Sequence, residues 1–198
     1  MLDIVVTTCP KYAHLLPTQR ACMERLPAFA GAHVTVLGAD QDYGWSGNLL
    51  RFLWARTDDA PFILLLDDYM LASADAEQLR IAEEFFLLRD VGCVRLFPCP
   101  GPDVGMNETK AFGWISRTAP YSVSLQAAAW KPSCLLSFLR PQWSPWDVET
   151  RGSQAVYTMP WSWVSCSRGY EALSYYNVMH RGVRDEGEWQ KTQEMLAR

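Results

Sequence analysis

Short apolar runs alternate with amphipathic stretches over the first third of the chain. Residues 3–8 (DIVVTT), 33–40 (HVTVLGAD) and 62–66 (FILLL) are rich in β-branched or aliphatic side chains, which is typical of buried strands. Residues 13–26 and 46–57 instead carry apolar side chains at helical spacing. This β-α-β-α-β order predicts a parallel sheet that is covered by helices.

The rest of the chain predicts a mixed arrangement. Residues 74–89 have the pattern of an amphipathic helix, and residues 99–110 form a Gly/Pro-rich loop. Two further helices are predicted at 132–140 and from about Pro145, and the charged tail is partly helical. Further strands are predicted at 91–98, 112–117, 121–130, 157–166 and 173–180. We therefore expect one α/β domain over residues 1–198, with a Rossmann-like mixed sheet flanked by helices.

Polar side chains follow three of the predicted strands at the point where each strand ends: Thr7 and Thr8, Asp40, and the pair Asp67–Asp68. In open α/β sheets, ligands bind at the edge where the carboxyl ends of the strands meet. Two adjacent carboxylates repel each other unless a cation, a proton or solvent separates them. Because Mg²⁺ and Mn²⁺ prefer oxygen ligands, the pair predicts a cation site. The alternative, a solvated strand end in which an Asp caps the next turn, stays open.

The stretch SPWDVETRGS (144–153) holds a second pair of acids, Asp147 and Glu149. Either is a candidate general base if an apolar wall such as Trp146 raises its pKa. In a strand the two side chains would share a face, whereas at a helix start they would point about 200° apart. Acids also favour the first turn of a helix because of the helix dipole, and this structural role is the alternative.

The stretch NVMHRG (177–182) places His180 after a predicted strand and before Arg181. His180 is a candidate metal ligand, and Arg181 is a candidate partner for diphosphate oxygens. An exposed histidine at a strand end is the structural alternative.

Composition and charge narrow the class of protein. Apolar residues make up 49% of the chain and charged residues 20%, which indicates a globular protein. Six cysteines without a CxxC pair favour a reducing compartment, and so a cytoplasmic location. The net charge of −4 argues against an extended nucleic-acid surface. No apolar run reaches the roughly 20 residues of a membrane span, and the first residues lack the basic region of a signal peptide. P-loop, GxGxxG and GxSxG motifs are absent from the sequence.

The stretches DIVVTT, FILLLDDYML, VSLQAAAW and SPWDVETRGS together resemble those of small GT-A-fold glycosyltransferases, in the style of the inverting family 2 enzymes. This resemblance implies a nucleotide-sugar donor near Thr7, Thr8 and Asp40. It also implies a DxD-type acidic motif that holds Mn²⁺ or Mg²⁺ on the diphosphate, here Asp67 and Asp68 with His180 as a further ligand. The sequence departs from the motif because Tyr69 stands where a second acid is usual.

In such enzymes the catalytic base is an acid on the acceptor side, which corresponds best to Glu149 and next to Asp147. Residues 1–98 would form the donor-binding half, residues 99–183 the acceptor half, and residues 184–198 a charged tail. The remaining expected contacts are Trp45, Asn48 and Arg181 with the donor, and Gln126 and Trp146 with the acceptor.

We therefore expect a metal-assisted glycosyltransferase that uses a nucleotide sugar, with a UDP-sugar as the leading candidate. The acceptor stays open between a polysaccharide, a lipid-linked sugar, a protein and a modified nucleobase, and nucleic acid enters only as an acceptor. A nucleotidyltransferase is one alternative, although it would need a Gly-rich phosphate loop after the first strand. A non-catalytic sugar-binding or assembly module with the same fold is the other.

Overall fold

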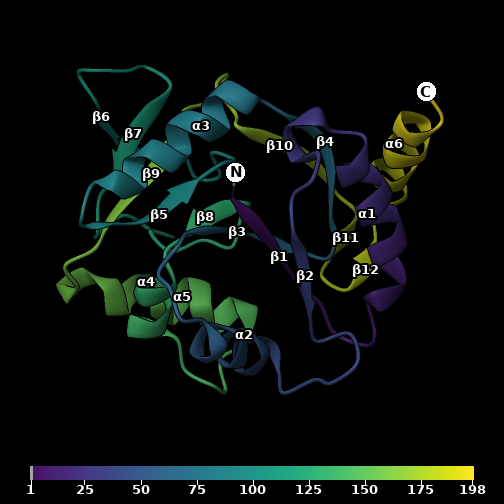
Figure 1. Ribbon diagram of the computed structural model, residues 1–198, viewed down its shortest axis with the longest axis horizontal. Helices are drawn as coiled ribbons and strands as arrows, with labels where there is room; N and C mark the ends of the chain where they lie inside the picture. The colour runs from purple at the N-terminus through teal and green to yellow at the C-terminus, as the bar shows by residue number, and fades with distance from the viewer. Residues whose placement is uncertain (1) are drawn as a thin grey trace.

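The computed structural model describes residues 2–198, and its centre is a mixed sheet with the strand order β2-β1-β3-β8-β5-β9-β7-β6 (Figure 1). β1 is parallel to β2 and β3, whereas β8 runs antiparallel between β3 and β5. The expected fold class, a mixed α/β sheet flanked by helices, is confirmed. The strands are β1 (Asp3–Thr7), β2 (Val34–Leu37), β3 (Phe62–Leu66), β5 (Val91–Arg95), β6 (Val104–Gly105), β7 (Phe112–Ile115), β8 (Ala128–Trp130) and β9 (Ser162–Cys166).

Side chains of the central strands alternate between two cores. Ile4 and Val6 of β1 point into one core, and Val5 points into the other, as the two-residue period of a strand requires. The first core is covered by α1 (Leu16–Glu24), α3 (Ala76–Glu84) and α6 (Glu186–Leu196). The second is covered by α2 (Trp45–Ala55), α4 (Pro132–Phe138) and α5 (Pro145–Ala155), seen at the bottom of Figure 1. Short 3-10 helices lie at Ala13–Leu15 (η1), Pro27–Phe29 (η2), Phe85–Leu87 (η3) and Val156–Thr158 (η4).

Two small antiparallel pairs bring the C-terminal part of the chain to the carboxyl end of β3. β4 (Tyr69–Ala74) pairs with β10 (Leu173–Asn177), and β11 (Met179–His180) pairs with β12 (Val183–Arg184). Tyr69 is opposite Asn177 in this pairing, and the Val178 N–H donates a hydrogen bond to the Asp68 carbonyl at 3.0 Å. The acidic turn is therefore fixed from the far end of the chain.

Several sequence predictions differ from the structure in detail. The predicted strand at 121–130 is regular only at Ala128–Trp130, while residues 121–127 form an irregular segment that surrounds part of the site. α2 begins at Trp45 with Gly44 as its N-cap at a φ of 77°, one residue before the predicted start at residue 46. β4 was not predicted, because it directly follows the two acids without a turn signal of glycine or proline.

No helix within residues 2–198 combines the length and the apolar character that crossing a membrane requires.

Candidate functional site

Asp67 and Asp68 form the turn between β3 and β4, at the carboxyl end of the parallel strands. The Asp67 N–H donates to the Thr7 carbonyl at 3.2 Å, and the Thr8 hydroxyl donates to Asp67 Oδ2 at 2.5 Å. Burial raises the pKa of Asp67, and the hydrogen bond from Thr8 and the charge of His14 oppose that shift. The predicted meeting of Thr7, Thr8 and the acidic pair at one edge is therefore present.

Asp68 has a different environment from Asp67. Its Oδ1 is buried and has no hydrogen-bond partner within residues 2–198. Burial, reinforced by the neighbouring Asp67 carboxylate, raises the pKa of Asp68 to about 7. A buried carboxylate oxygen without a donor costs free energy, which a bound cation or a proton would relieve. Asp68 thus differs from Asp67 in that its buried carboxylate oxygen Oδ1 has no hydrogen-bond partner within residues 2–198.

Gln19 of α1 is hydrogen-bonded to the main chain on both sides of this turn, a role that was not predicted from the sequence. Its Nε2 donates to the Leu66 carbonyl at 2.6 Å and to the Tyr69 carbonyl at 3.2 Å, one on each side of the two acids. Gln19 is buried on the same helical face as Cys22 and Met23. A polar residue within that apolar stripe is the signal that would have revealed it.

A cavity of about 530 Å³ lies on the donor side that the sequence predicted, and Asp40 and Asn48 line it. Asn48 also fixes the loop before α2, because its Oδ1 accepts from the Tyr43 N–H at 2.8 Å and its Nδ2 donates to Asp42 Oδ1 at 3.0 Å. The Arg51 guanidinium lies 4.3 Å from the centre of the Tyr43 ring, and both side chains line this cavity. Neither Tyr43 nor Arg51 was predicted.

Trp45 at the start of α2 is hydrogen-bonded to the end of β1. Its indole Nε1 donates to the Thr7 hydroxyl at 2.9 Å, and the Thr7 hydroxyl in turn lies 3.3 Å from the Leu65 carbonyl. Trp45 and Thr7 therefore form part of the wall between α2 and β1.

Glu149 lines a second cavity, of about 400 Å³, together with Leu66, Tyr69, Gln126 and Trp146. Glu149 Oε1 accepts from the Leu125 N–H at 2.8 Å and lies 3.3 Å from Ser124 Oγ. Leu66 and Tyr69, the residues that flank the two acids in the chain, line this cavity together with Glu149, so the cavity lies next to the acidic turn. Burial raises the pKa of Tyr69, and its phenol is therefore neutral.

Asp147 caps the start of its own helix instead. Its carboxylate accepts from the Ser144 N–H at 3.0 Å while the Asp147 N–H donates to the Ser144 hydroxyl at 3.2 Å, which is a capping box at the start of α5. Arg151 lies 3.0 Å from the other carboxylate oxygen. The hydrogen bonds from Ser144 lower the pKa of Asp147. Of the two acids, Glu149 is the one that faces a cavity, as expected for side chains two positions apart on a helix.

Two stacked tyrosines support Gln126 in the Glu149 cavity. The rings of Tyr69 and Tyr175 are 4.2 Å apart and nearly parallel, at 21°. The Tyr175 hydroxyl donates to Gln126 Oε1, which leaves the amide Nε2 of Gln126 as its hydrogen-bond donor. Trp146 is 65% exposed at the rim of the same cavity.

His180 and Arg181 are exposed in the β11–β12 hairpin. Arg181 and Gly182 form its turn with φ values of 50° and 81°. Within residues 2–198, no group of three or more His, Cys, Asp or Glu side chains is arranged to hold a metal ion. His180 therefore does not join Asp67 and Asp68 in such a group, and its role as a ligand stays a prediction.

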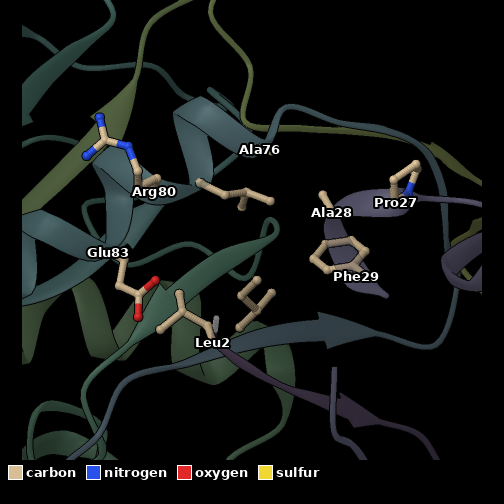
Figure 2. A pocket seen from close by; sticks show the side chains of 9 residues that line it. Leu2, Pro27, Ala28, Phe29, Ala76, Arg80 and Glu83 are labelled. Carbon is tan, nitrogen blue, oxygen red and sulfur yellow. The ribbon is translucent and has the colours of Figure 1, made fainter. Parts of the chain in front are cut away.

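An apolar cavity of about 320 Å³ lies near the amino end of β1, next to Leu2, which precedes that strand. Figure 2 shows Leu2 and Phe29 facing this space, while Arg80 extends away from it. Arg80 pairs instead with Glu77 and Glu84 on its own helix. This cavity is thus separate from the acidic turn.

No family model matches the chain, and no curated protein matches it in sequence. Among solved structures, the chain is similar to the crystal structure of S. aureus TarS 1-349, a glycosyltransferase, with a TM-score of 0.49 and 12% identity. The similarity covers 99% of this chain and 64% of that chain, so this chain spans less than two thirds of that structure. A likeness this distant says nothing about individual residues of the site.

Proposed function

We propose that the protein is a glycosyltransferase that moves a sugar from a nucleotide-diphosphate sugar, with a UDP-sugar as the expected donor, to an acceptor hydroxyl. One observation carries the proposal: Glu149 faces a cavity whose wall includes Tyr69, the residue that follows Asp68. A candidate base and a candidate diphosphate site are thus neighbours at the ligand-binding edge of the sheet.

Glu149 acts as the general base in this proposal. Its carboxylate takes the proton of the acceptor hydroxyl as the hydroxyl oxygen attacks the anomeric carbon. The new carbon–oxygen bond forms as the bond from the anomeric carbon to the phosphate oxygen breaks, and the nucleoside diphosphate leaves with that electron pair. This single displacement inverts the configuration at the anomeric carbon.

The donor would occupy the rim from the Asp40 cavity to the acidic turn. Tyr43 offers an aromatic face to the nucleotide base, and Arg51 offers a guanidinium beside it. Arg181 in the exposed hairpin would pair with diphosphate oxygens. In this arrangement Trp45 and Asn48 support the donor site through Thr7 and through the Tyr43 loop.

The residues at the acidic turn fit a divalent cation such as Mn²⁺ or Mg²⁺. The test of that fit is Asp68 Oδ1, a buried carboxylate oxygen without a partner within residues 2–198. Asp68 and Asp67 would hold the cation, because magnesium commonly takes one or two protein carboxylates and completes its shell with phosphate and water. When bound, the cation would supply positive charge to the departing diphosphate.

The acceptor is proposed to be a sugar that lies against Trp146 and donates its reacting hydroxyl toward Glu149. The exposed Trp146 ring suits the apolar face of a sugar, and Gln126 Nε2 offers a donor to one of its oxygens. A hydroxylated nucleobase is the alternative acceptor.

A non-catalytic sugar-binding module is the second candidate function. The observation in its favour is that Tyr69 stands where the DxD-type motif usually has a second acid. Glu149 separates the two candidates, because a binding module has no need of a base in its cavity.

A thermal-shift screen tests the proposal directly. Nucleotide sugars and nucleoside diphosphates would each be added with and without Mn²⁺. A ligand at about 100 times its Kd stabilises the folded state by about 2.7 kcal/mol. We expect at least one nucleotide to raise the melting temperature, and a complete lack of stabilisation by nucleotides would contradict the proposal.

A further inference from the structure

Arg95 at the end of β5 is a cation in the interior of the protein, with 1% of its surface exposed. Its hydrogen bonds go to main-chain carbonyls: Nη1 donates to Pro100, and Nη2 donates to Tyr121 at 3.0 Å and to Ser122 at 3.2 Å. A buried guanidinium without a directly paired carboxylate is costly, and the hydrogen bonds to these carbonyls offset part of that cost.

The carbonyls that Arg95 binds belong to two irregular segments. Pro100 follows β5, and Tyr121 and Ser122 precede β8. Ser124 Oγ lies 3.3 Å from the Cys99 carbonyl, so the two segments also meet each other next to Arg95. Arg95 thus joins two loops that have no regular hydrogen-bonding ladder of their own at these residues.

The segment that contains Tyr121 and Ser122 also contacts Glu149, through Ser124 and Leu125. The Leu125 N–H donates to Glu149 Oε1 at 2.8 Å, and Ser124 Oγ lies 3.3 Å from the same oxygen. The route from Arg95 to the carboxylate therefore consists of the short stretch 121–125, with a hydrogen-bonded anchor at each end.

Charge adds to this geometric connection. Burial lowers the pKa of Arg95, and the negative charge of Glu149 is among the influences that oppose that shift. Glu149 acts electrostatically on two side chains, Arg95 on β5 and Tyr69 on β4, and the pKa of Tyr69 is raised by burial first and by nearby acids that include Glu149. Arg95 is the cation of this set.

We propose that Arg95 is a positioning residue for Glu149: it fixes the segment 121–125 so that the Leu125 N–H and Ser124 hold the Glu149 carboxylate toward its cavity. This inference rests on the proposed function for its catalytic consequence, which is a lower kcat with little change in KM when Arg95 is altered. A small displacement of a base reduces turnover about tenfold to a hundredfold.

The test combines a signal that needs no substrate with turnover. The amide proton of Leu125, observed by NMR, responds to its charge-assisted hydrogen bond with Glu149, and the variant Glu149→Ala defines the signal without that bond. We expect Arg95→Met to move the Leu125 signal toward the Glu149→Ala value, and Arg95→Lys to move it less. A Leu125 signal at the wild-type position in Arg95→Met would overturn the proposal.

Two further variants separate positioning from simple loss of stability. Ser124→Ala keeps Arg95 but removes one contact to Glu149, and we expect a smaller shift of the same signal; this variant and Arg95→Lys decide the matter if Arg95→Met does not fold. Leu26→Ala destabilises the core on the other face of the sheet and should leave both the Leu125 signal and kcat unchanged. The proposal would be overturned if Leu26→Ala shifted the Leu125 signal, or lowered kcat, as much as Arg95→Met does.

The NMR result and the turnover result also distinguish this inference from the proposed function. Wild-type turnover in Glu149→Ala would refute Glu149 as the base, while a shifted Leu125 signal in Arg95→Met would still support the positioning of its side chain. Loss of turnover in Glu149→Ala with an unshifted Leu125 signal in Arg95→Met would refute only the role of Arg95.

Discussion

Asp68 and Asp67 share one turn but have opposite hydrogen-bonding environments. Asp67 Oδ2 accepts from the Thr8 hydroxyl at 2.5 Å, whereas Asp68 Oδ1 is buried without a partner within residues 2–198. The sequence could not tell which acid would face a ligand. Because Asp67 is already engaged with the end of β1, we expect Asp68 to be the main ligand.

The first prediction concerns stability and pH. Burial and the Asp67 charge raise the pKa of Asp68 from 3.8 to about 7. The folded state therefore binds a proton more tightly than the unfolded state, and stability falls as pH rises from about 4 through 7. Asp68→Asn removes this loss and should increase the free energy of unfolding at pH 8 by roughly 2–4 kcal/mol. Urea unfolding of both proteins at pH 5 and pH 8 measures this difference in the free energy of unfolding. A lower free energy of unfolding for Asp68→Asn than for wild type at pH 8 would contradict the account.

The second prediction concerns the cation. Because carboxylate ligands must be deprotonated, Mn²⁺ should stabilise the wild-type protein more at pH 8 than at pH 6. Thermal shifts with and without Mn²⁺ measure this difference. Asp68→Asn should abolish the Mn²⁺-dependent shift, whereas Glu108→Gln, which alters an exposed acid in the 99–110 loop, should keep it. An equal Mn²⁺ effect in Asp68→Asn and wild type would refute the assignment.

The third prediction separates the two acids of α5. Glu149→Gln should lower kcat by about 10²–10⁴-fold, the range for loss of a general base, with stability largely kept. Asp147→Asn should instead weaken the capping box and reduce the free energy of unfolding by about 0.5–2 kcal/mol, with kcat nearly unchanged. Steady-state kinetics and urea unfolding of both variants measure the contrast. The reverse pattern would assign the base to Asp147.

The fourth prediction concerns the donor side of the sheet. Gly38 has a φ of 90°, and a Cβ there would lie 2.2 Å from the Thr8 carbonyl and 2.7 Å from Asn48 Nδ2. Gly31 has a similar φ of 79° but nothing within 4 Å. Gly38→Ala should therefore destabilise the protein by about 1–3 kcal/mol more than Gly31→Ala, and it should weaken nucleotide binding. Equal unfolding free energies for the two variants would show that the Gly38 contact is unimportant.

The sequence predicted the strands that end at the site because their apolar runs are unambiguous. DIVVTT and FILLL are buried strands in the structure, and Thr7, Thr8, Asp67 and Asp68 meet at their carboxyl ends. Polar residues after buried strands, in a chain with β-α-β order, were sufficient for this part.

The rest of the site depends on contacts that sequence periodicity does not encode. Val123 and Leu125 alternate with serines as in a strand, yet the segment is irregular because Arg95 and Glu149 take up its main-chain groups. Gln19 has the sequence position of an ordinary helical residue. Arg51 lies against Tyr43, which belongs to the loop that is hydrogen-bonded to Asn48. Apart from Gln19, whose polar side chain interrupts an apolar helical stripe, these long-range hydrogen bonds leave no local pattern in the sequence.

Turnover of the nucleotide sugar tests the central claim most directly. Release of nucleoside diphosphate from a stabilising nucleotide sugar would be followed with a panel of sugar acceptors, for the wild-type protein and for Glu149→Gln. We predict acceptor-dependent release by the wild-type protein and a loss of at least about a hundredfold in Glu149→Gln. Equal acceptor-dependent release by the two proteins would contradict the account.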